Sequence, residues 1–370
     1  MLDAEDREAW LRLTLNPGLG RAAMRRLLAA FGSAGHVLQA GAGAWREVAG
    51  AAAAQALATP DATLAPRVDA AQRWLAESAG RSLVTLADAS YPPLLLQTPD
   101  PPLLLYLHGR PELLAAPALA MVGSRNATTQ GLDNARAFAA HLSGEGWTIV
   151  SGLAQGIDGA AHEGGLKARG STVAVVGQGL DRVYPRQHHE LARRIAAEGL
   201  LLSEFGPGTP PLPTNFPQRN RIIAGLARGV LVVEAALRSG SLITARLAAE
   251  HGREVFAVPG SIHSPQARGC HALIREGAKL VESAADLLEE LGPALAPRAL
   301  PITARTPVDD SPAAPEPLLD AMGHDPVSLD ALGARTGWPT SELLAKLLEL
   351  ELDGQVERRP GGLFQRRHRA

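Results

Sequence analysis

Between residues 81 and 292, short continuous apolar runs alternate with longer segments whose apolar positions recur at helical spacing. Continuous apolar runs are typical of parallel strands that are buried on both faces, and the segments between them are typical of crossover helices. The pattern predicts an α/β fold with a Rossmann-like, doubly wound sheet. The predicted strands are 83–86, 103–107, 119–122, 148–150, 172–176, 200–203, 230–233, 255–258 and 279–281.

The segments on either side of this core have different patterns. Residues 1–80 are alanine-rich and helical, and 15–33 have the glycine spacing of a helix-hairpin-helix. That hairpin could offer backbone N–H groups to a DNA phosphate, or the helices could simply pack against the core, and the sequence favours neither. Seven prolines between 293 and 317 predict a semi-extended linker.

Residues 318–370 have a winged-helix pattern of helices followed by a hairpin near 356–364. The third predicted helix, 340–353, has a local charge of −3, since it contains four carboxylates and one basic residue, Lys346. An acidic helix is repelled by the phosphates that line the major groove. The charge therefore favours a protein contact or a packing role over duplex DNA.

Composition sets outer bounds. The chain has 370 residues, a net charge of −2 and one cysteine, Cys270. We expect a cytoplasmic protein, because a lone cysteine fits a reducing compartment, the N-terminus lacks a signal-peptide pattern, and no apolar run is long enough to span a membrane. The net charge argues against general polyanion binding. The segment 213–253, however, is locally basic, because it contains six arginines and only two glutamates.

Small residues follow the predicted strands at three places. Gly123, Ser124 and Arg125 follow one strand, Ser151 and Gly152 another, and Ser239, Gly240 and Ser241 come shortly after a third. Such loops should meet at the carboxyl edge of the sheet, where helix N-termini favour anions. The sequence therefore predicts phosphate binding at this edge, with Arg125 as a bidentate donor.

The segment FPQRNR contributes an aromatic and two arginines to the same region. Pro217 suits a first helical turn, which leaves Phe216 at the entrance of the helix. We expect Phe216 to stack on a base, with core packing as the alternative. Arg219, Asn220 and Arg221 follow as predicted DNA contacts, although one of the two arginines could instead bridge to Glu234 or Glu204.

Asp158 and His162 are four residues apart on a predicted helix, which is a spacing that metal ligands use. No third ligand accompanies them, so we expect Asp158 to accept hydrogen bonds from neighbouring loop N–H groups. We assign no catalytic residue, no metal site and no cofactor.

In their order and spacing, these motifs resemble the DNA-processing protein A (DprA, or Smf) family. The resemblance rests on GSR at 123–125, SGLAQGID at 151–158, GLD at 179–181 with YP at 184–185, FPQRNRII at 216–223 and RSGSLITA at 238–245. It implies a single-stranded DNA-binding protein of recombination and natural transformation (competence), without catalytic activity. It also implies a homodimer that helps replace single-strand-binding protein with the RecA recombinase, and a variable, SAM-like N-terminal domain. Arg186 falls where the family tends to have a basic residue that faces DNA.

A nucleotide-binding or nucleotide-hydrolysing enzyme of the lysine-decarboxylase-like (LOG) group is the alternative. That group uses a PGGxGTxxE loop, whereas the segment from Ser239 lacks the proline and has Ala245 and Arg246 in place of the acid. The carboxylate that would stabilise positive charge on a sugar is therefore missing. The sequence also contains no GxxxxGK[ST] motif and no GxGxxG motif after a strand.

Overall fold

The computed structural model describes residues 3–292, 317–323 and 326–367. The chain forms two compact units, Met1–Leu295 and Ala296–Ala370, so the N-terminal helices and the sheet share one unit. The predicted linker, 293–317, lies outside the described residues except for Pro317. Within the described ranges, no helix is both long enough and apolar enough to cross a membrane.

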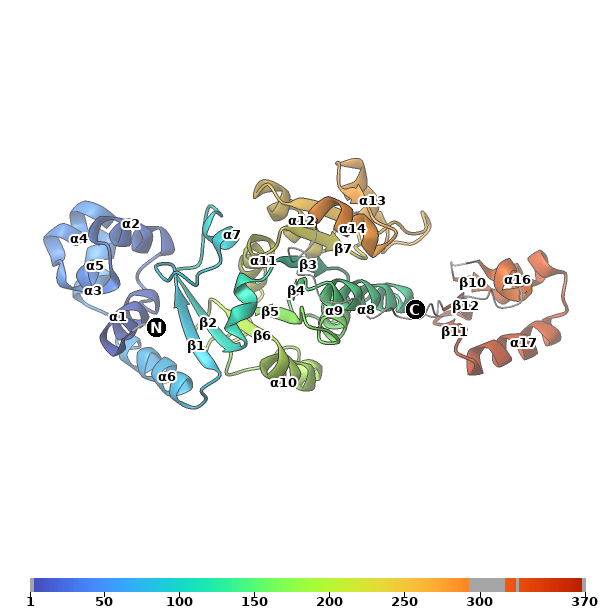
Figure 1. The fold of residues 1–370 in the computed structure, drawn as a ribbon, viewed down its shortest axis with the longest axis horizontal. Coiled ribbons are helices and arrows are strands. Elements are labelled where there is room, and N and C mark those ends of the chain that lie inside the picture. The colour runs from blue at the N-terminus through green and yellow to red at the C-terminus, as the bar shows by residue number, and fades with distance from the viewer. Residues whose placement is uncertain (1–2, 293–316, 324–325, 368–370) are drawn as a thin grey trace, which may run out of the picture. The chain divides into compact units, whose positions relative to one another are not determined.

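The first unit is built on a nine-stranded sheet, and the predicted α/β fold is confirmed (Figure 1). Its strands are β1 (Arg81–Thr85), β2 (Leu104–Gly109), β3 (Ala118–Val122), β4 (Thr148–Ser151), β5 (Thr172–Val176), β6 (Leu200–Ser203), β7 (Gly229–Val232), β8 (Glu254–Ala257) and β9 (Lys279–Leu280). Their order is β1-β2-β6-β5-β4-β3-β7-β8-β9. In this order the seven strands β6, β5, β4, β3, β7, β8 and β9 are parallel to their neighbours, whereas β2 pairs antiparallel with both β1 and β6.

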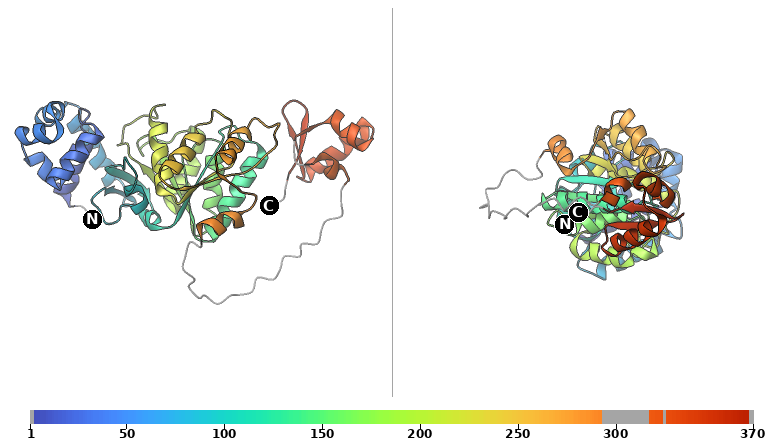
Figure 2. Two further views of the ribbon diagram at one scale, coloured as in Figure 1. Left: turned by 90° about the horizontal axis from the view of Figure 1, so that it is seen from above. Right: turned by 90° about the vertical axis from the view of Figure 1, so that its right-hand side faces the viewer.

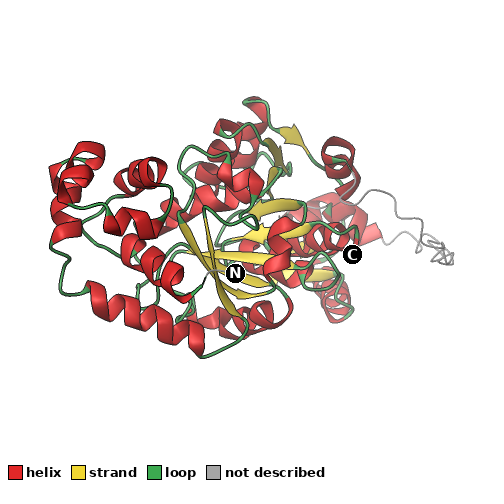
Figure 3. Cartoon of the chain, turned by 60° about the vertical axis from the view of Figure 1, so that its left-hand side comes forward, coloured by secondary structure: helices red, strands yellow, loops and turns green. Residues whose placement is uncertain are grey.

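Helices cover both faces of this sheet (Figure 3). They are α7 (Pro93–Leu96), α8 (Thr129–Gly144), α9 (Ile157–Gly165), α10 (His189–Glu198), α11 (Asn215–Leu226), α12 (Ser241–Glu250), α13 (Arg268–Arg275) and α14 (Ala284–Leu291). Along β3, Ala120 and Val122 pack in the core beneath α11, α12 and α13, whereas Leu119 and Met121 pack beneath α8, α9 and α14. Both faces are apolar because both are covered, which explains the continuous apolar runs.

Six helices precede the sheet: α1 (Ala4–Thr14), α2 (Arg21–Phe31), α3 (Ala34–Gln39), α4 (Ala42–Ala49), α5 (Ala51–Ala58) and α6 (Leu64–Ala76). They lie beyond the β1–β2 end of the sheet (Figure 2). Trp74 of α6 packs edge-on against Tyr106 of β2, with ring centroids 5.9 Å apart. The turn between α1 and α2 contains Gly18, and a Cβ on this glycine would lie 2.9 Å from the Cβ of Ala56. The hairpin glycine therefore serves close packing within the bundle.

The second unit has the predicted winged-helix pattern. Its elements are α15 (Pro317–Met322), β10 (Val327–Ser328), α16 (Leu329–Thr336), α17 (Thr340–Leu352), β11 (Val356–Arg359) and β12 (Leu363–Arg366). The strands form an antiparallel sheet in the order β10-β12-β11. Leu343, Leu347 and Leu350 anchor α17 to the core of this unit.

Candidate functional site

A cavity lies where the sheet changes its winding direction. From β3 the chain proceeds outward through β4, β5 and β6, whereas β7, β8 and β9 extend the other way. Loops that follow β3 and β7 must therefore separate, and a crevice opens between them. The crevice holds about 720 Å³. The residues that line the crevice include Gly123, Ser124, Arg125, Asp158, Tyr184, Phe216, Arg219, Asn220, Arg238, Ser239, Gly240 and Ser241.

Glu234 holds the loop after β3 in place. Its backbone oxygen accepts a hydrogen bond from the Ser124 N–H at 2.7 Å, and its carboxylate accepts one from the Thr128 N–H at 2.9 Å. A Cβ on Gly123 would lie 2.6 Å from Cγ1 of Ile157 and 2.8 Å from the Glu234 oxygen. Glycine at 123 is thus required by packing, and the loop that presents Arg125 is fixed from below.

The loop after β4 is held by buried polar groups. Asp158 accepts hydrogen bonds from the N–H groups of Gly152 at 3.1 Å and Ala154 at 3.3 Å, as the sequence predicted. Burial raises the pKa of Asp158, and the nearby charge of Arg219 opposes that rise. Ser151 is buried and donates to the Met121 oxygen at 2.6 Å. The structure therefore gives Ser151 a supporting role in place of the predicted DNA contact.

Leu153, in the same loop, has a φ of 59°. This left-handed conformation costs about 1–2 kcal/mol in a non-glycine residue. Two histidines secure it: the Leu153 N–H donates to Nε2 of His162 at 3.2 Å, and His188 Nδ1 lies 3.0 Å from the Leu153 oxygen. The side chain of His162 is therefore used within the loop, which explains its helical spacing from Asp158 without a metal.

Arg219 connects α11 to this loop from a buried position. Its Nη2 donates to the Gly152 oxygen at 2.8 Å, and its Nη1 donates to Oδ1 of Asn220 at 3.1 Å. Asn220 in turn points its amide at the Gly240 oxygen, 3.5 Å away. Burial lowers the pKa of Arg219, while the charge of Asp158 opposes that change. Arg219 and Asn220 thus tie together the loops after β4 and β7.

An aromatic pair and an arginine stand on the rim of the crevice. The rings of Phe216 and Tyr184 are 5.8 Å apart at an angle of 32°, and the guanidinium of Arg125 lies 5.7 Å from the Phe216 centroid. Phe216 is half-buried, whereas Tyr184 is 44% exposed. Phe216 therefore belongs to the rim of the cavity, although its inner side packs near Gly177.

A smaller cavity of about 80 Å³ continues beneath Phe216. Gln178 and Arg219 both line it, and both are buried. Nε2 of Gln178 and Nε of Arg219 have no hydrogen-bond partner among the described residues. Unmade hydrogen bonds of this kind cost about 1–3 kcal/mol each, so a ligand that supplies acceptors here would gain affinity.

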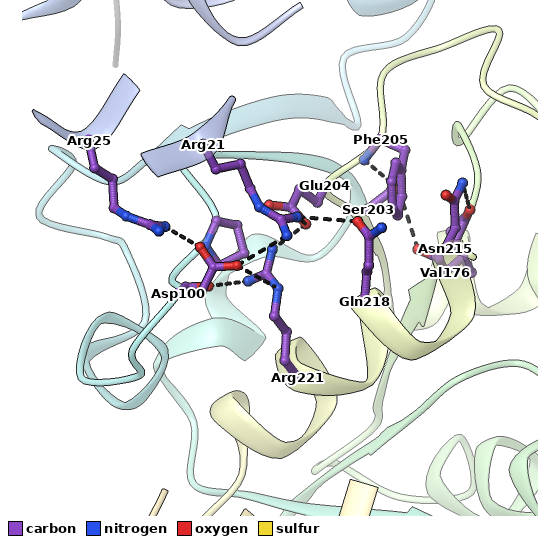
Figure 4. A network of polar contacts seen from close by, with 12 residues as sticks. Arg21, Arg25, Asp100, Val176, Ser203, Glu204, Phe205, Asn215, Gln218 and Arg221 are labelled. Carbon is purple, nitrogen blue, oxygen red and sulfur yellow. Dashed lines mark hydrogen bonds and ion pairs between the residues drawn. The ribbon is translucent and has the colours of Figure 1, made fainter. Parts of the chain in front are cut away.

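Arg221 lies elsewhere, in an ion-pair network with the N-terminal helices (Figure 4). Its guanidinium contacts Glu204 and Asp100, and its side chain is 11% exposed. Arg21 of α2 pairs with the same two carboxylates at 3.4 and 3.2 Å, and Arg25 contacts Asp100. Burial alone would raise the pKa of Asp100, but the Arg25 hydrogen bond and the charges of Arg221 and Arg21 lower it. Arg221 therefore fastens the helices to the core, as the Glu204 alternative anticipated, and is not at the crevice.

The remaining predicted residues divide between rim and exterior. Ser239 and Ser241 line the crevice at the start of α12, and their hydroxyls lie 2.6 Å apart. Arg186 is exposed, beside Tyr184 and Pro185 but outside the lining of either cavity. Sequence reasoning gave no site role to Tyr184, Arg238 or Gln178. Arg238 could have been found, since it immediately precedes the Ser-Gly-Ser loop.

The fold and the crevice define a Rossmann-like protein with a cavity at a switch point between parallel strands. Residues 82–292 match the family model for DNA recombination-mediator protein A, and 302–362 match the DprA winged helix domain. The chain therefore belongs to the DNA recombination-mediator protein A family, also called DprA or Smf.

Three relatives illustrate the similarity. Protein Smf from Escherichia coli is 45% identical over 298 residues, which cover 80% of this chain and 79% of that protein. The crystal structure of DprA from Streptococcus pneumoniae matches with a TM-score of 0.68 and 39% identity, over 78% of this chain and 99% of that one. DprA from Helicobacter pylori, described for its single-stranded DNA binding mode, matches with a TM-score of 0.52 and 31% identity, over 57% and 95%.

Proposed function

We propose that the chain binds single-stranded DNA in the crevice between the loops after β3 and β7. The observation that carries this proposal is the rim, where Arg125, Phe216 and Tyr184 form one contiguous surface over a cavity of about 720 Å³. A cation next to aromatic rings suits a strand whose phosphates and bases alternate. Stacking tolerates every base, so binding should show little dependence on sequence.

Phosphates would be held by charges and backbone groups on the crevice walls. Arg125 and Arg238 are exposed on opposite sides of it, and Ser239 and Ser241 offer hydroxyls at the N-terminus of α12. A helix N-terminus favours anions because its first N–H groups lack intrahelical partners. Arg186, exposed beside the aromatic pair, would extend the phosphate path beyond the rim.

A single strand fits this surface better than a duplex does. The rings of Phe216 and Tyr184 can contact a base only if its faces are unstacked, which a duplex prevents at an energetic cost. One unstacked base could also direct its edge into the cavity lined by Gln178 and Arg219, where donors lack partners. Single-stranded DNA should therefore be preferred.

Binding, without catalysis, is the proposed activity. Asp158 lines the crevice and Glu234 holds the loop after β3, and both accept hydrogen bonds from backbone N–H groups that shape these loops. That use leaves neither one positioned as the free acid that the nucleotide-hydrolysing alternative needs. We further propose that a homodimer protects incoming DNA in natural transformation, displaces single-strand-binding protein and loads RecA. Membership of a recombination-mediator family supports the role in recombination, and the Helicobacter pylori relative, described for its single-stranded DNA binding mode, supports the DNA-binding part alone.

The test is a competition experiment with the full chain. A labelled oligothymidine is bound and then challenged with unlabelled single-stranded or duplex DNA of equal length. We expect single-stranded DNA to compete at least about tenfold better. Equal competition by the duplex would contradict the proposal. RecA loading is measured separately, as RecA-dependent strand exchange on DNA coated with single-strand-binding protein, and its absence would refute only that second part.

A further inference from the structure

The outer face of α17 carries an exposed ridge of leucines. Leu344, Leu348 and Leu352 are 40%, 57% and 81% exposed, while the opposite face of the helix packs in the core of its unit. Residues four apart lie above one another on a helix, so the three form one continuous row. We call these three residues the α17 ridge. A contiguous apolar row on a surface is a mark of an interaction site.

Carboxylates flank the α17 ridge on both sides. With about 100° between successive residues of a helix, Glu351 falls on one side of the row, and Glu342 and Glu349 fall on the other. All three are exposed, and Glu349 pairs with Lys346 at 3.1 Å. The row therefore has an apolar centre and an acidic border.

These features point to one kind of occupant. Duplex DNA would face carboxylates and leucines where it needs cations. A second copy of α17 would place one acidic border against another, which opposes association. A helix with an apolar stripe bordered by lysine or arginine would match both the row and its border.

We propose that the α17 ridge is a docking site for an amphipathic helix of a partner protein, with an apolar stripe flanked by basic residues. The α17 ridge belongs to Ala296–Ala370, whereas the crevice belongs to Met1–Leu295. The winged helix thus serves as a protein-docking module.

The probe is a fluorescent helical peptide with leucines at positions i, i+4 and i+8 and lysines on both sides, titrated with the full chain. Its control is a twin with glutamate in place of each lysine. We expect the lysine peptide to bind about tenfold or more tightly than its twin, with affinity that falls as salt rises. Equal binding of the two peptides would overturn the proposal.

Substitutions locate the binding face. The double variant Leu348→Ser/Leu352→Ser should bind the lysine peptide about tenfold or more weakly than wild type. The control is Ile262→Ser, at a residue of the other unit that is 74% exposed, and it should leave the affinity for the peptide unchanged. Glu351→Lys should reduce the ratio of the affinity for the lysine peptide to the affinity for its glutamate twin. Circular dichroism confirms that each variant is folded. Unchanged binding in the double variant would refute the site. Sedimentation measures self-association of the chain. If the chain self-associates and Leu348→Ser abolishes this, the α17 ridge binds a second copy of the chain, and the proposed partner helix is refuted as well.

Discussion

The guanidinium of Arg219 occupies the space that a side chain on Gly152 would need. Nη2 of Arg219 donates a hydrogen bond to the Gly152 oxygen at 2.8 Å, and a Cβ added at residue 152 would overlap the guanidinium itself. The pair joins the loop after β4 to α11, the helix that starts beside Phe216. Glycine at 152 therefore exists to seat a buried arginine, and phosphate contact is not needed to explain it.

Gly152→Ala should lower the free energy of unfolding by about 1–3 kcal/mol, the usual result of overpacking, and should weaken binding of single-stranded DNA. Urea denaturation and an oligothymidine titration measure the two effects. Gly240→Ala is the matched control for stability alone, because that glycine has a φ of −64° and no atom within 4 Å of an added Cβ, although it lines the crevice. Equal stability of both variants would show that Arg219 can move aside freely.

Arg221→Ala should lower the free energy of unfolding and leave the salt dependence of DNA binding unchanged. The substitution removes a cation from Glu204, whose side chain is 11% exposed. Because Arg21 still pairs with Glu204 at 3.4 Å, we expect a loss smaller than the roughly 3–5 kcal/mol that a buried charge without any partner costs. In Arg193→Ala, which breaks an exposed pair with Glu190, we expect no measurable change. A flattened salt dependence in Arg221→Ala would return this arginine to the DNA site.

Phe216→Ala should weaken binding of single-stranded DNA by about one to two decades, since stacking on an aromatic ring contributes about 1–3 kcal/mol per base. Its melting temperature should fall only slightly, because the ring is half-buried on the rim. Leu212→Ala, at a 45% exposed residue of the same segment, controls for lost apolar surface. A large drop in melting temperature with unchanged DNA affinity would place Phe216 in the core.

His162 should make the fold less stable in acid. Burial, with the charges of His188 and Arg219, lowers the pKa of His162 from 6.5 to about 3. Between these values the unfolded chain binds the extra proton, so stability is full above pH 6.5 and falls toward pH 3. The slope approaches about 1.4 kcal/mol per pH unit. Urea unfolding of wild type and His162→Gln across this range isolates the effect, since other titrating groups remain. Parallel stability curves for the two proteins would contradict it.

Strand positions could be predicted from the sequence because the parallel strands are covered on both faces and so contain continuous apolar runs. Val173 and Val175 face one layer while Ala174 and Val176 face the other, and all four are buried. The antiparallel pairing of β2 with β6 could not be predicted, because apolar runs do not encode strand direction. Nor did the sequence reveal that the N-terminal helices share a compact unit with the sheet.

The residues of the site were predicted less completely than its loops. Motif spacing brought Arg125, Phe216 and Ser239 to one crevice. It could not separate Arg219 from Arg221, which are two residues apart on one helix and point to different surroundings. Gln178 was missed because its unpaired amide is a property of burial. Tyr184 is paired with Phe216 only by the fold, since 32 positions separate them (216 − 184).

The most direct measurement is the salt dependence of oligothymidine binding by wild type and Arg125→Ala. Each phosphate contact on a single strand contributes about −0.7 to the slope of log affinity against log salt. Removal of Arg125 should make the slope shallower by about that amount and weaken binding to every sequence alike. The control is Arg169→Ala, an exposed arginine in the loop before β5, at the opposite edge of the sheet, and it should match wild type. If Arg125→Ala keeps the affinity and slope of wild type, single-stranded DNA does not bind in this crevice.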